Sequence, residues 1–439
     1  MRRAIILGLL LAGMQLVLPL GMSGHHSQSL LTFGFLILAA YTVGEIAVTM
    51  RMPRIVGYLL AGLIFGRSLL NVVDSGSVQM LAPINSLAIA LIAFLAGAEL
   101  RWEEVRPYAR TIAKILATEI PLTFTSVAVL MLAMRPFMPF MAEAPLPQAI
   151  AFGVLFAAMA AVHSPAVTIG ILSETGARGP VARTVLGVVL VSDVVIILAF
   201  SAALSVAQAL APPPGLAQTA GGPGMLAWEL GGAVLVGILL GGAVSIYIRF
   251  VKKELFLFAI MVAFLGAEVA RLVHVETLLT LLVTGIVSEN ASPKEAGLAL
   301  RGAMERAAAP VFVVFFALAG ASLLLSDILS VWYLVIPIVV VRALAIRQGT
   351  LIGARWAGAA PVIRSNAWMG LVSQAGVAIG LATAVSEVYP TRGGQLKTLF
   401  LAAVAVNEFL GPILFKRALS RAGETVPGGM SSAAAPATQ

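Results

Sequence analysis

The stretch HSPAVTIGILSETGARGPVARTVLGVVLVSD, residues 163–193, contains the two features on which the fold and the function depend. Near its start, Pro165 follows His163 and Ser164 inside an apolar run, and at its end Asp193 stands in the apolar segment VVLVSDVVII. Proline lacks an N–H and disfavours helix at the residue before it, so the first feature predicts an interrupted helix. A carboxylate at membrane depth is costly, so the second feature indicates a functional group.

The composition predicts a polytopic membrane protein. Of the 439 residues, 60% are hydrophobic and 11% are charged, whereas a soluble domain is about half apolar and about a quarter charged. The net charge of +8 comes from Lys and Arg dispersed in short loops, which favours positive-inside sorting over binding to nucleic acid. The chain has no cysteine and four scattered histidines, so we expect no metal site, no cofactor and no enzymatic activity.

Apolar runs long enough to cross a bilayer predict an all-α chain. Residues 1–24 have a basic start and an apolar core, and they are either a cleaved signal peptide or an extra N-terminal helix. Loops rich in Lys and Arg alternate with loops that nearly lack them, which predicts a cytoplasmic C-terminus. We expect a disordered cytoplasmic tail over residues 421–439. The predicted helices cover residues 4–22, 28–50, 54–71, 82–101, 110–134, 147–173, 180–209, 225–250, 254–272, 275–290, 304–323, 330–355, 363–387 and 394–417.

Short sequence similarities indicate an internal repeat. LAGAEL (95–100) recurs as LAGASL (318–323), and the same offset of 223 residues aligns LLAGLI (59–64) with LVTGIV (282–287). The offset also aligns Glu119 with Arg342, and a small slip aligns VSDVV (191–195) with VNEFL (406–410). The paired helices are an odd number of spans apart, so the two copies have opposite topology. Inverted repeats of this kind are typical of secondary transporters, whose site lies near the midplane where the repeats meet.

Two predicted spans contain a possible interruption near their middle. The span 147–173 carries Pro165, and the span 363–387 carries the small and polar residues Ser373-Gln374-Ala375-Gly376. Either feature alone is compatible with an ordinary kink or a glycine packing contact. At corresponding positions of two repeats, they favour a pair of discontinuous helices that cross near the site.

Asp193 is the strongest candidate for an ion-binding residue. A buried carboxylate can hold either a proton or a hard monovalent cation, and the remaining ligands are then expected to be oxygens such as those of Ser192, Ser164 and Thr168. One site with mutually exclusive occupants gives obligatory antiport. We therefore hypothesise cation and proton exchange at Asp193.

The other ionisable residues in the spans receive supporting roles. Arg342 cannot shed its proton, so it needs a carboxylate or several carbonyls, and Glu119 is the partner suggested by the repeat. Arg347 is the alternative arginine at the site. For Glu408, reaching or capping toward the cytoplasmic side is favoured over direct ion binding. His163 is read more readily as a neutral, hydrogen-bonded histidine than as a direct participant.

The ordered set of segments VGYLLAGLIFG, LIAFLAGAELR, residues 163–193, PVFVVFFALAG, VSQAGVAIGLA and NEFLGPILFKRAL resembles the bacterial monovalent cation:proton antiporter family. The resemblance covers about residues 28–420. It implies a thirteen-helix protomer in the inner membrane, usually a homodimer. In it, a core domain (110–209 and 330–417) moves against a scaffold (28–101 and 254–323), and 225–250 is a linker helix.

The resemblance also implies roles for particular residues. Asp193 matches the family's essential aspartate, and Ser164 and Thr168 match the break in its crossing helix. Ser192 stands where the family has Asn or Asp, and His163 stands near the usual threonine. Because Asp193 is the only carboxylate at positions 192 and 193, we expect electroneutral exchange of one cation (Na⁺, K⁺ or Li⁺) for one proton. Family members with two acidic residues at these positions often carry a lysine in the span that here contains Arg342. The position of that lysine aligns with Ile346, one turn beyond Arg342.

Two other readings stay open from the sequence. The first is a sodium-coupled symporter for an organic anion, which would need additional polar residues at both crossings. The second is a membrane sensor or assembly scaffold that retains the transporter fold but has lost ion exchange.

Overall fold

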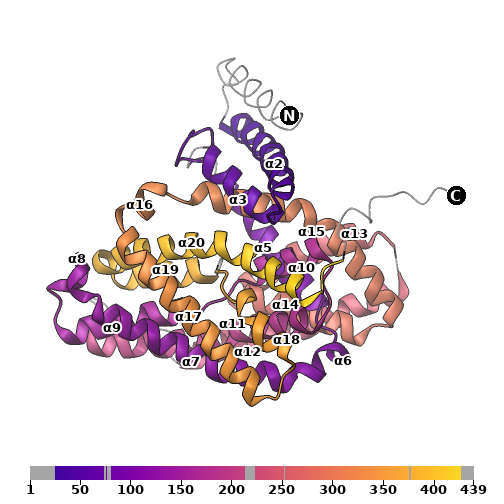
Figure 1. The fold of residues 1–439 in the computed structure, drawn as a ribbon. Coiled ribbons are helices and arrows are strands. Elements are labelled where there is room, and N and C mark those ends of the chain that lie inside the picture. Colours follow the sequence, from indigo (N-terminus) through magenta and orange to yellow (C-terminus); the bar gives the residue numbers. More distant parts are fainter. Residues whose placement is uncertain are drawn as a thin grey trace. The chain divides into compact units, whose positions relative to one another are not determined.

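The computed structural model describes residues 25–73, 76, 81–212, 223–251, 253–374 and 377–426. The predicted helix 4–22 lies outside these residues, as do residues 427–439 of the predicted tail. Within them every regular element is helical, as the apolar runs predict (Figure 1). Eight helices are long and apolar enough to cross a membrane, and shorter apolar helices include Arg54–Phe65 and Thr277–Ala291. The all-α, polytopic fold class predicted from the sequence is thereby confirmed.

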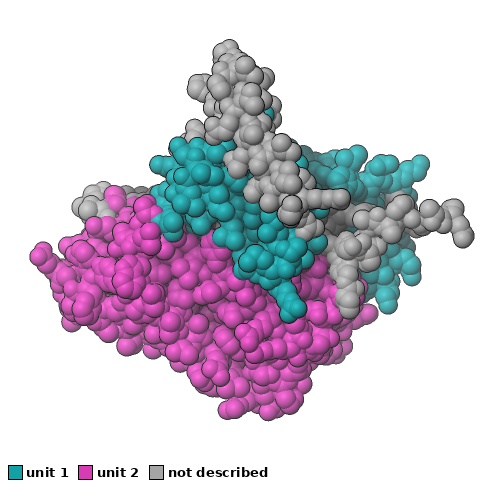
Figure 2. Space-filling model, turned by 45° about the horizontal axis from the view of Figure 1, so that its top comes forward, with its two compact units in different colours: residues 1–101, 227–325 teal, residues 102–226, 326–439 magenta. Residues whose placement is uncertain are grey.

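The chain folds into two compact units, each built from two separate parts of the sequence (Figure 2). The first unit comprises Met1–Arg101 and Ala227–Leu325, and the second comprises Trp102–Leu226 and Ser326–Gln439. The expected scaffold segments lie in the first unit and the expected core segments in the second. Movement of one against the other stays a prediction.

The first unit brings helices of the two predicted repeats together. Its helices are α2 (His25–Thr49), α3 (Arg54–Phe65), α5 (Ala82–Ala98), most of α12 (Pro223–Phe250), α13 (Leu255–Leu272), α14 (Thr277–Ala291) and α15 (Lys294–Ser322). Helix α3 packs against α15, and α5 packs against α14.

Glycines allow the helix backbones in these two crossings to touch. A Cβ atom on Gly62 of α3 would collide with the carbonyl oxygen of Ala317 in α15, and one on Gly285 of α14 would collide with that of Phe94 in α5. Gly62 and Gly285 are related by the 223-residue offset found in the sequence. The two crossings are therefore equivalent, as an inverted repeat requires, and small residues allow the close approach as in other membrane helix pairs.

The second unit contains the interrupted helices. Its helices are α6 (Trp102–Val105), η2 (Arg106–Tyr108), α7 (Ala109–Ala133), η3 (Arg135–Phe137), α8 (Pro139–Ala142), α9 (Leu146–Ala160), α10 (Pro165–Thr175), α11 (Pro180–Leu210), α16 (Leu325–Ser330, which begins one residue before the unit), α17 (Trp332–Trp356), α18 (Pro361–Asn366), η4 (Ala367–Gly370), α19 (Val377–Val388) and α20 (Pro390–Ala422). Helices α7 and α17, which the repeat relates, pack side by side. Gly349 of α17 lies against the backbone of Glu119, and the Thr118 hydroxyl donates to the Gly349 carbonyl at 2.7 Å.

Two predicted boundaries were wrong because basic segments were read as loops. Helix α15 begins at Lys294 rather than at residue 304, and its Arg301 forms two hydrogen bonds with the carboxylate of Glu99, the C-cap residue of α5. Helix α20 continues to Ala422, beyond the predicted end at residue 417. Positive charge marks the end of a membrane crossing, but a helix can extend past that end.

The start of the predicted disordered tail is also ordered. After Gly423 ends α20, the Glu424 carboxylate accepts hydrogen bonds from the backbone N–H groups of Val181 and Ala182 at 2.7 and 2.9 Å. These N–H groups belong to the first turn of α11, which has no cap from its own N-cap residue Gly179. The C-terminal segment therefore caps the helix that carries Asp193.

Candidate functional site

The first interruption lies where Pro165 predicts it. Helix α9 ends at Ala160, α10 begins at Pro165, and the residues between them are not helical. Ser164 is extended, with φ −111° and ψ 105°, and its hydroxyl accepts a hydrogen bond from the Val167 N–H at 3.2 Å. Proline forces the preceding residue out of the helix, and that residue then serves as the N-cap of α10.

The second interruption lies at the predicted small and polar segment. The 3-10 turn η4 ends at Gly370, residues 371–374 are not helical, and α19 begins at Val377. Gly376, a predicted supporting residue, lies outside the described residues. Gly411 of α20 packs against Ser373, and a Cβ atom added at position 411 would collide with Ser373. The two discontinuous helices predicted from the sequence are therefore present in one unit.

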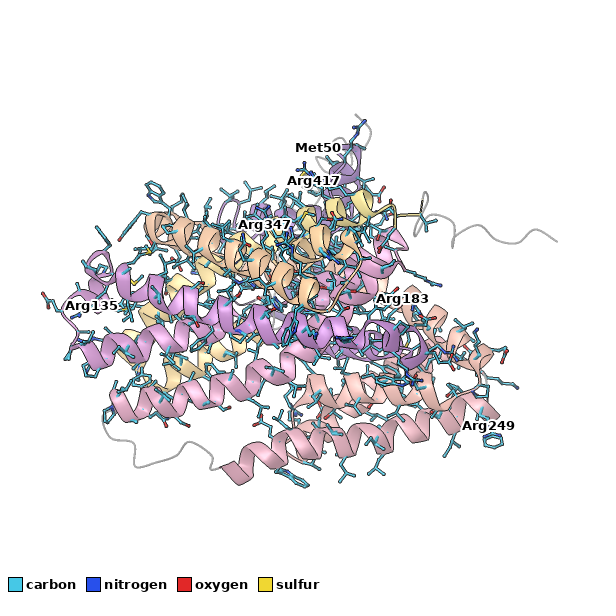
Figure 3. The ribbon with its side chains drawn as sticks, turned by 60° about the horizontal axis from the view of Figure 1, so that its bottom comes forward. Met50, Arg135, Arg183, Arg249, Arg347 and Arg417 are labelled. Carbon is cyan, nitrogen blue, oxygen red and sulfur yellow. The ribbon has the colours of Figure 1, made fainter. Side chains whose placement is uncertain are left out.

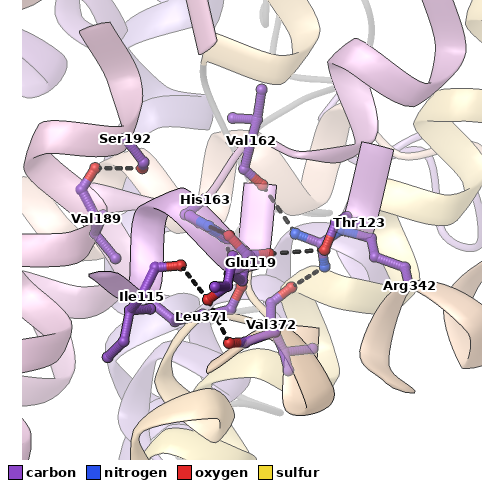
Figure 4. A network of polar contacts seen from close by, with 12 residues as sticks. Ile115, Glu119, Thr123, Val162, His163, Val189, Ser192, Arg342, Leu371 and Val372 are labelled. Carbon is purple, nitrogen blue, oxygen red and sulfur yellow. Dashed lines mark hydrogen bonds and ion pairs between the residues drawn. The ribbon is translucent and has the colours of Figure 1, made fainter. Parts of the chain in front are cut away.

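Arg342 of α17 connects the two interruptions (Figure 4). Its Nε donates to the Ala160 carbonyl at 2.6 Å, and one terminal nitrogen donates to the Val162 carbonyl at 2.8 Å. The other terminal nitrogen donates to the Val372 carbonyl at 2.5 Å. The residue is 1% exposed. A broken helix leaves carbonyl oxygens without hydrogen-bond donors. The single guanidinium group of Arg342 donates to such oxygens in both breaks.

The choice between the two candidate arginines is settled by their burial. Arg347 lies further along α17 and is exposed, with its guanidinium 5.9 Å from the centroid of the Trp368 ring (Figure 3). Arg342 is the arginine that contacts the breaks. The expected direct pairing of Arg342 with Glu119 is not among the ion pairs of the described residues, because the guanidinium is already engaged by three carbonyls.

Glu119 instead pairs with His163. The His163 Nε2 lies 3.2 Å from the Glu119 carboxylate, whose other oxygen accepts from the Thr123 hydroxyl at 2.8 Å. His163 Nδ1 lies 2.8 Å from the carbonyl oxygen of Leu371. Since a carbonyl can only accept, Nδ1 carries a hydrogen, and one further proton is shared between Nε2 and the carboxylate. His163, in the first break, thus contacts both α7 and the second break.

Gln374 extends the polar network to α20. Its Nε2 donates to the Ala160 carbonyl at 3.3 Å, and its Oε1 accepts from the Asn407 amide at 2.8 Å. The neighbouring Glu408 is 2% exposed. This burial does not fit a carboxyl group that reaches an exposed surface, and the side of the membrane toward which Glu408 lies stays a prediction. Asn407 is not among the residues predicted for the site, although VNEFL aligns with VSDVV and Asn407 then corresponds to Ser192.

Asp193 and its predicted partners occupy α11 and α10, which pack against each other. Asp193 is partly buried and follows the fully buried Ser192, whose hydroxyl donates to the Val189 carbonyl of its own helix at 2.7 Å. Thr168 of α10 is completely buried, and its hydroxyl oxygen has no hydrogen-bond partner among the described residues. The Ser164 hydroxyl caps α10 but keeps acceptor capacity. A role for these four residues in ion binding stays a prediction.

The comparisons with known proteins agree with this architecture. The family model described as "Sodium/hydrogen exchanger, transmembrane" matches residues 33–420. Two structures of the sodium proton antiporter MjNhaP1 from Methanocaldococcus jannaschii are similar at 17% identity. The structure at pH 8 has a TM-score of 0.66 over 92% of this chain and 97% of that one, and the electron-microscopy structure has 0.70 over 90% and 98%. A search of curated proteins gave no match. These two likenesses show the shared antiporter fold, and the match of the family model over most of the sequence shows that this chain belongs to the sodium/hydrogen exchanger family of multi-pass membrane transporters.

Proposed function

We propose that the protein exchanges one monovalent cation, Na⁺ or K⁺, for one proton across the bacterial inner membrane, with Asp193 as the shared site. The second unit would move against the first by alternating access in a homodimer whose C-termini are cytoplasmic. The occupied carboxylate is neutral, and only that form can pass an apolar gate at low cost.

The observation that carries this proposal is the way Arg342 holds both helix breaks. Its three hydrogen bonds go to the carbonyls of Ala160, Val162 and Val372, so its positive charge lies against oxygens of both helix breaks. The Thr168 hydroxyl, on the helix packed against α11, has no hydrogen-bond partner among the described residues, and we propose it as an oxygen ligand that acts with Asp193. A fixed arginine and a single exchanging carboxylate support electroneutral exchange, because the site holds either one cation or one proton.

The symporter alternative receives less support from the same geometry. An organic anion would need a cationic partner near the crossing, and Arg342 is the buried candidate. Its guanidinium is engaged at all three nitrogens and is 1% exposed. The sensor alternative predicts an intact fold without cation-driven proton movement, so a transport assay separates it from exchange.

The test is reconstitution of the full chain into vesicles that contain a pH-sensitive dye. Adding Na⁺, K⁺ or Li⁺ should move protons in the wild type and leave Asp193→Asn inactive. Asp327→Asn, on α16 outside the long apolar helices, is the matched control and should behave as the wild type. Proton movement that survives Asp193→Asn would remove Asp193 as the site. A rate that changes with an imposed membrane potential would contradict electroneutral exchange.

A further inference from the structure

Glu408 is a buried carboxylate that the proposed exchange does not use. It lies in the middle of α20 and is 2% exposed, and its Oε1 has no hydrogen-bond partner among the described residues. An ionised carboxylate in such a position costs several kcal/mol unless it is paired. Glu408 therefore requires a proton or a bound cation whenever the unit adopts this conformation.

Its neighbour Asn407 presents a second oxygen of the same kind. The Asn407 amide nitrogen donates to Gln374 Oε1 at 2.8 Å, and this bond assigns which end of the amide group is nitrogen. The Asn407 Oδ1 can only accept, is buried, and has no hydrogen-bond partner among the described residues. Two adjacent residues thus each hold an unsatisfied oxygen, and buried oxygens of this type are normally satisfied.

The inverted repeat gives these two residues a counterpart. VNEFL (406–410) aligns with VSDVV (191–195), so Asn407 and Glu408 correspond to Ser192 and Asp193. The structure supports the correspondence, because α11 and α20 are both long helices that directly follow an interrupted helix. Gln374 and Ser373 of the second break contact Asn407 and Gly411, one turn apart on α20. Asn407, the first residue of the polar and acidic pair, therefore contacts a helix break.

We propose that Asn407 and Glu408 form a second site for a monovalent cation, with a proton as the competing occupant of Glu408. The oxygens of Asn407 and Glu408 are the hard ligands that such a cation prefers. This second site is distinct from Asp193 and adds a second binding event to the proposed exchange. The proposal rests on the proposed function only for the identity of the ligand, a monovalent cation.

Among the charged groups whose side chains are described on the elements packed against α20, none hydrogen-bonds to Glu408. Helix α20 contacts α9, α10, α11, α17, α18, α19 and η4. Arg342 is held by carbonyls of the two breaks, Arg364 donates to the Ala359 carbonyl, and Glu174 pairs with Lys416 of α20 itself. The remaining ionisable residues of these elements whose side chains are described are Asp193, Arg183, Tyr333, Arg347 and Arg355. The hydrogen bonds of the described residues join none of them to Glu408.

The test measures cation binding to the purified full chain in detergent through its thermal unfolding temperature. Sodium, lithium or potassium chloride is compared with choline chloride, from acidic to alkaline pH. We expect the cation-dependent rise in Tm to persist in Asp193→Asn and to grow with pH, because the cation must displace a proton. The rise should be lost in Asp193→Asn combined with Glu408→Gln, and retained when Asp193→Asn is combined with Glu143→Gln, an exposed control.

Three outcomes would overturn the proposal: no cation-dependent rise in the wild type, its complete loss in folded Asp193→Asn, or its persistence in the double variant that combines Asp193→Asn with Glu408→Gln. If the double variant does not fold, infrared spectroscopy of wild type and Glu408→Gln replaces it. A protonated carboxyl band that disappears in Glu408→Gln and is lost from the wild type on adding cation is expected, and a band insensitive to cation contradicts the site. Neither measurement depends on transport, so failure of the proposed exchange would be seen separately.

Discussion

The crossing helices of the first unit and the interrupted helices of the second unit are held together by different kinds of contact. In the first unit, α3 and α5 touch α15 and α14 backbone to backbone at glycines. In the second unit, the polar ends of broken helices are held by the buried side chains of Arg342 and His163. Glycine crossings bring helix backbones into direct contact, whereas the side-chain network buries ionisable groups at the helix breaks. The following substitutions test that contrast.

Replacing Arg342 with Met should have the largest effect, because it removes the donors of three carbonyls at once. A buried carbonyl that loses its donor costs about 1–3 kcal/mol, and three lose theirs here, so the unfolding temperature of the purified protein in detergent should fall strongly. Arg347→Met on the exposed side of the same helix is the control and should leave it nearly unchanged. Equal effects of the two substitutions would contradict the role given to Arg342.

Gly62→Ala tests the packing of the first unit. The added methyl group would collide with the carbonyl oxygen of Ala317, and overpacking of this kind typically costs about 1–3 kcal/mol. Gly242→Ala in α12 is the matched control, since a Cβ there meets nothing within 4 Å. Thermal unfolding should show a lower Tm for Gly62→Ala alone. An unchanged Tm for Gly62→Ala would mean that the α3–α15 crossing has room for an added methyl group.

The His163–Glu119 contact predicts energetic coupling within the second unit. Glu119→Gln and His163→Gln should each destabilise, while the double variant should lose less than their sum. We expect a coupling of about 1.5 kcal/mol for a hydrogen bond with charge character. Chemical or thermal unfolding of the four proteins provides the measurement. Strict additivity would show that the 3.2 Å contact contributes nothing to stability.

Glu424→Ala should have the smallest effect of the four. It removes the cap from the first turn of α11, and a lost N-cap typically costs about 1 kcal/mol. Hydrogen exchange of the Val181 and Ala182 amides should accelerate, while amides in α7 stay protected. Glu424→Gln retains an acceptor and should lie between wild type and alanine. Unchanged exchange at Val181 in Glu424→Ala would exclude the cap.

The sequence predicted features that have a local cause. Pro165 predicted the first break because proline acts on its immediate neighbours, and apolar length predicted the spans. The partners of Arg342 could not be predicted, because the carbonyls of Ala160, Val162 and Val372 carry no signal in residue type. Repeat symmetry instead suggested Glu119, which is nearby in the network but bonded to His163. The near-complete burial of Glu408 could not be predicted, because it depends on which helices pack around α20.

The glycine crossings of the first unit have a consequence for the order of synthesis. Gly62 and Gly97 lie in the first hundred residues, but their contacts come from α15 and α14. At about 5–20 residues per second, partners roughly 200 residues downstream emerge about 10–40 s later. The early helices must therefore wait in the membrane with their small-residue faces uncovered, while the whole of α7 to α11 is inserted between them and their partners.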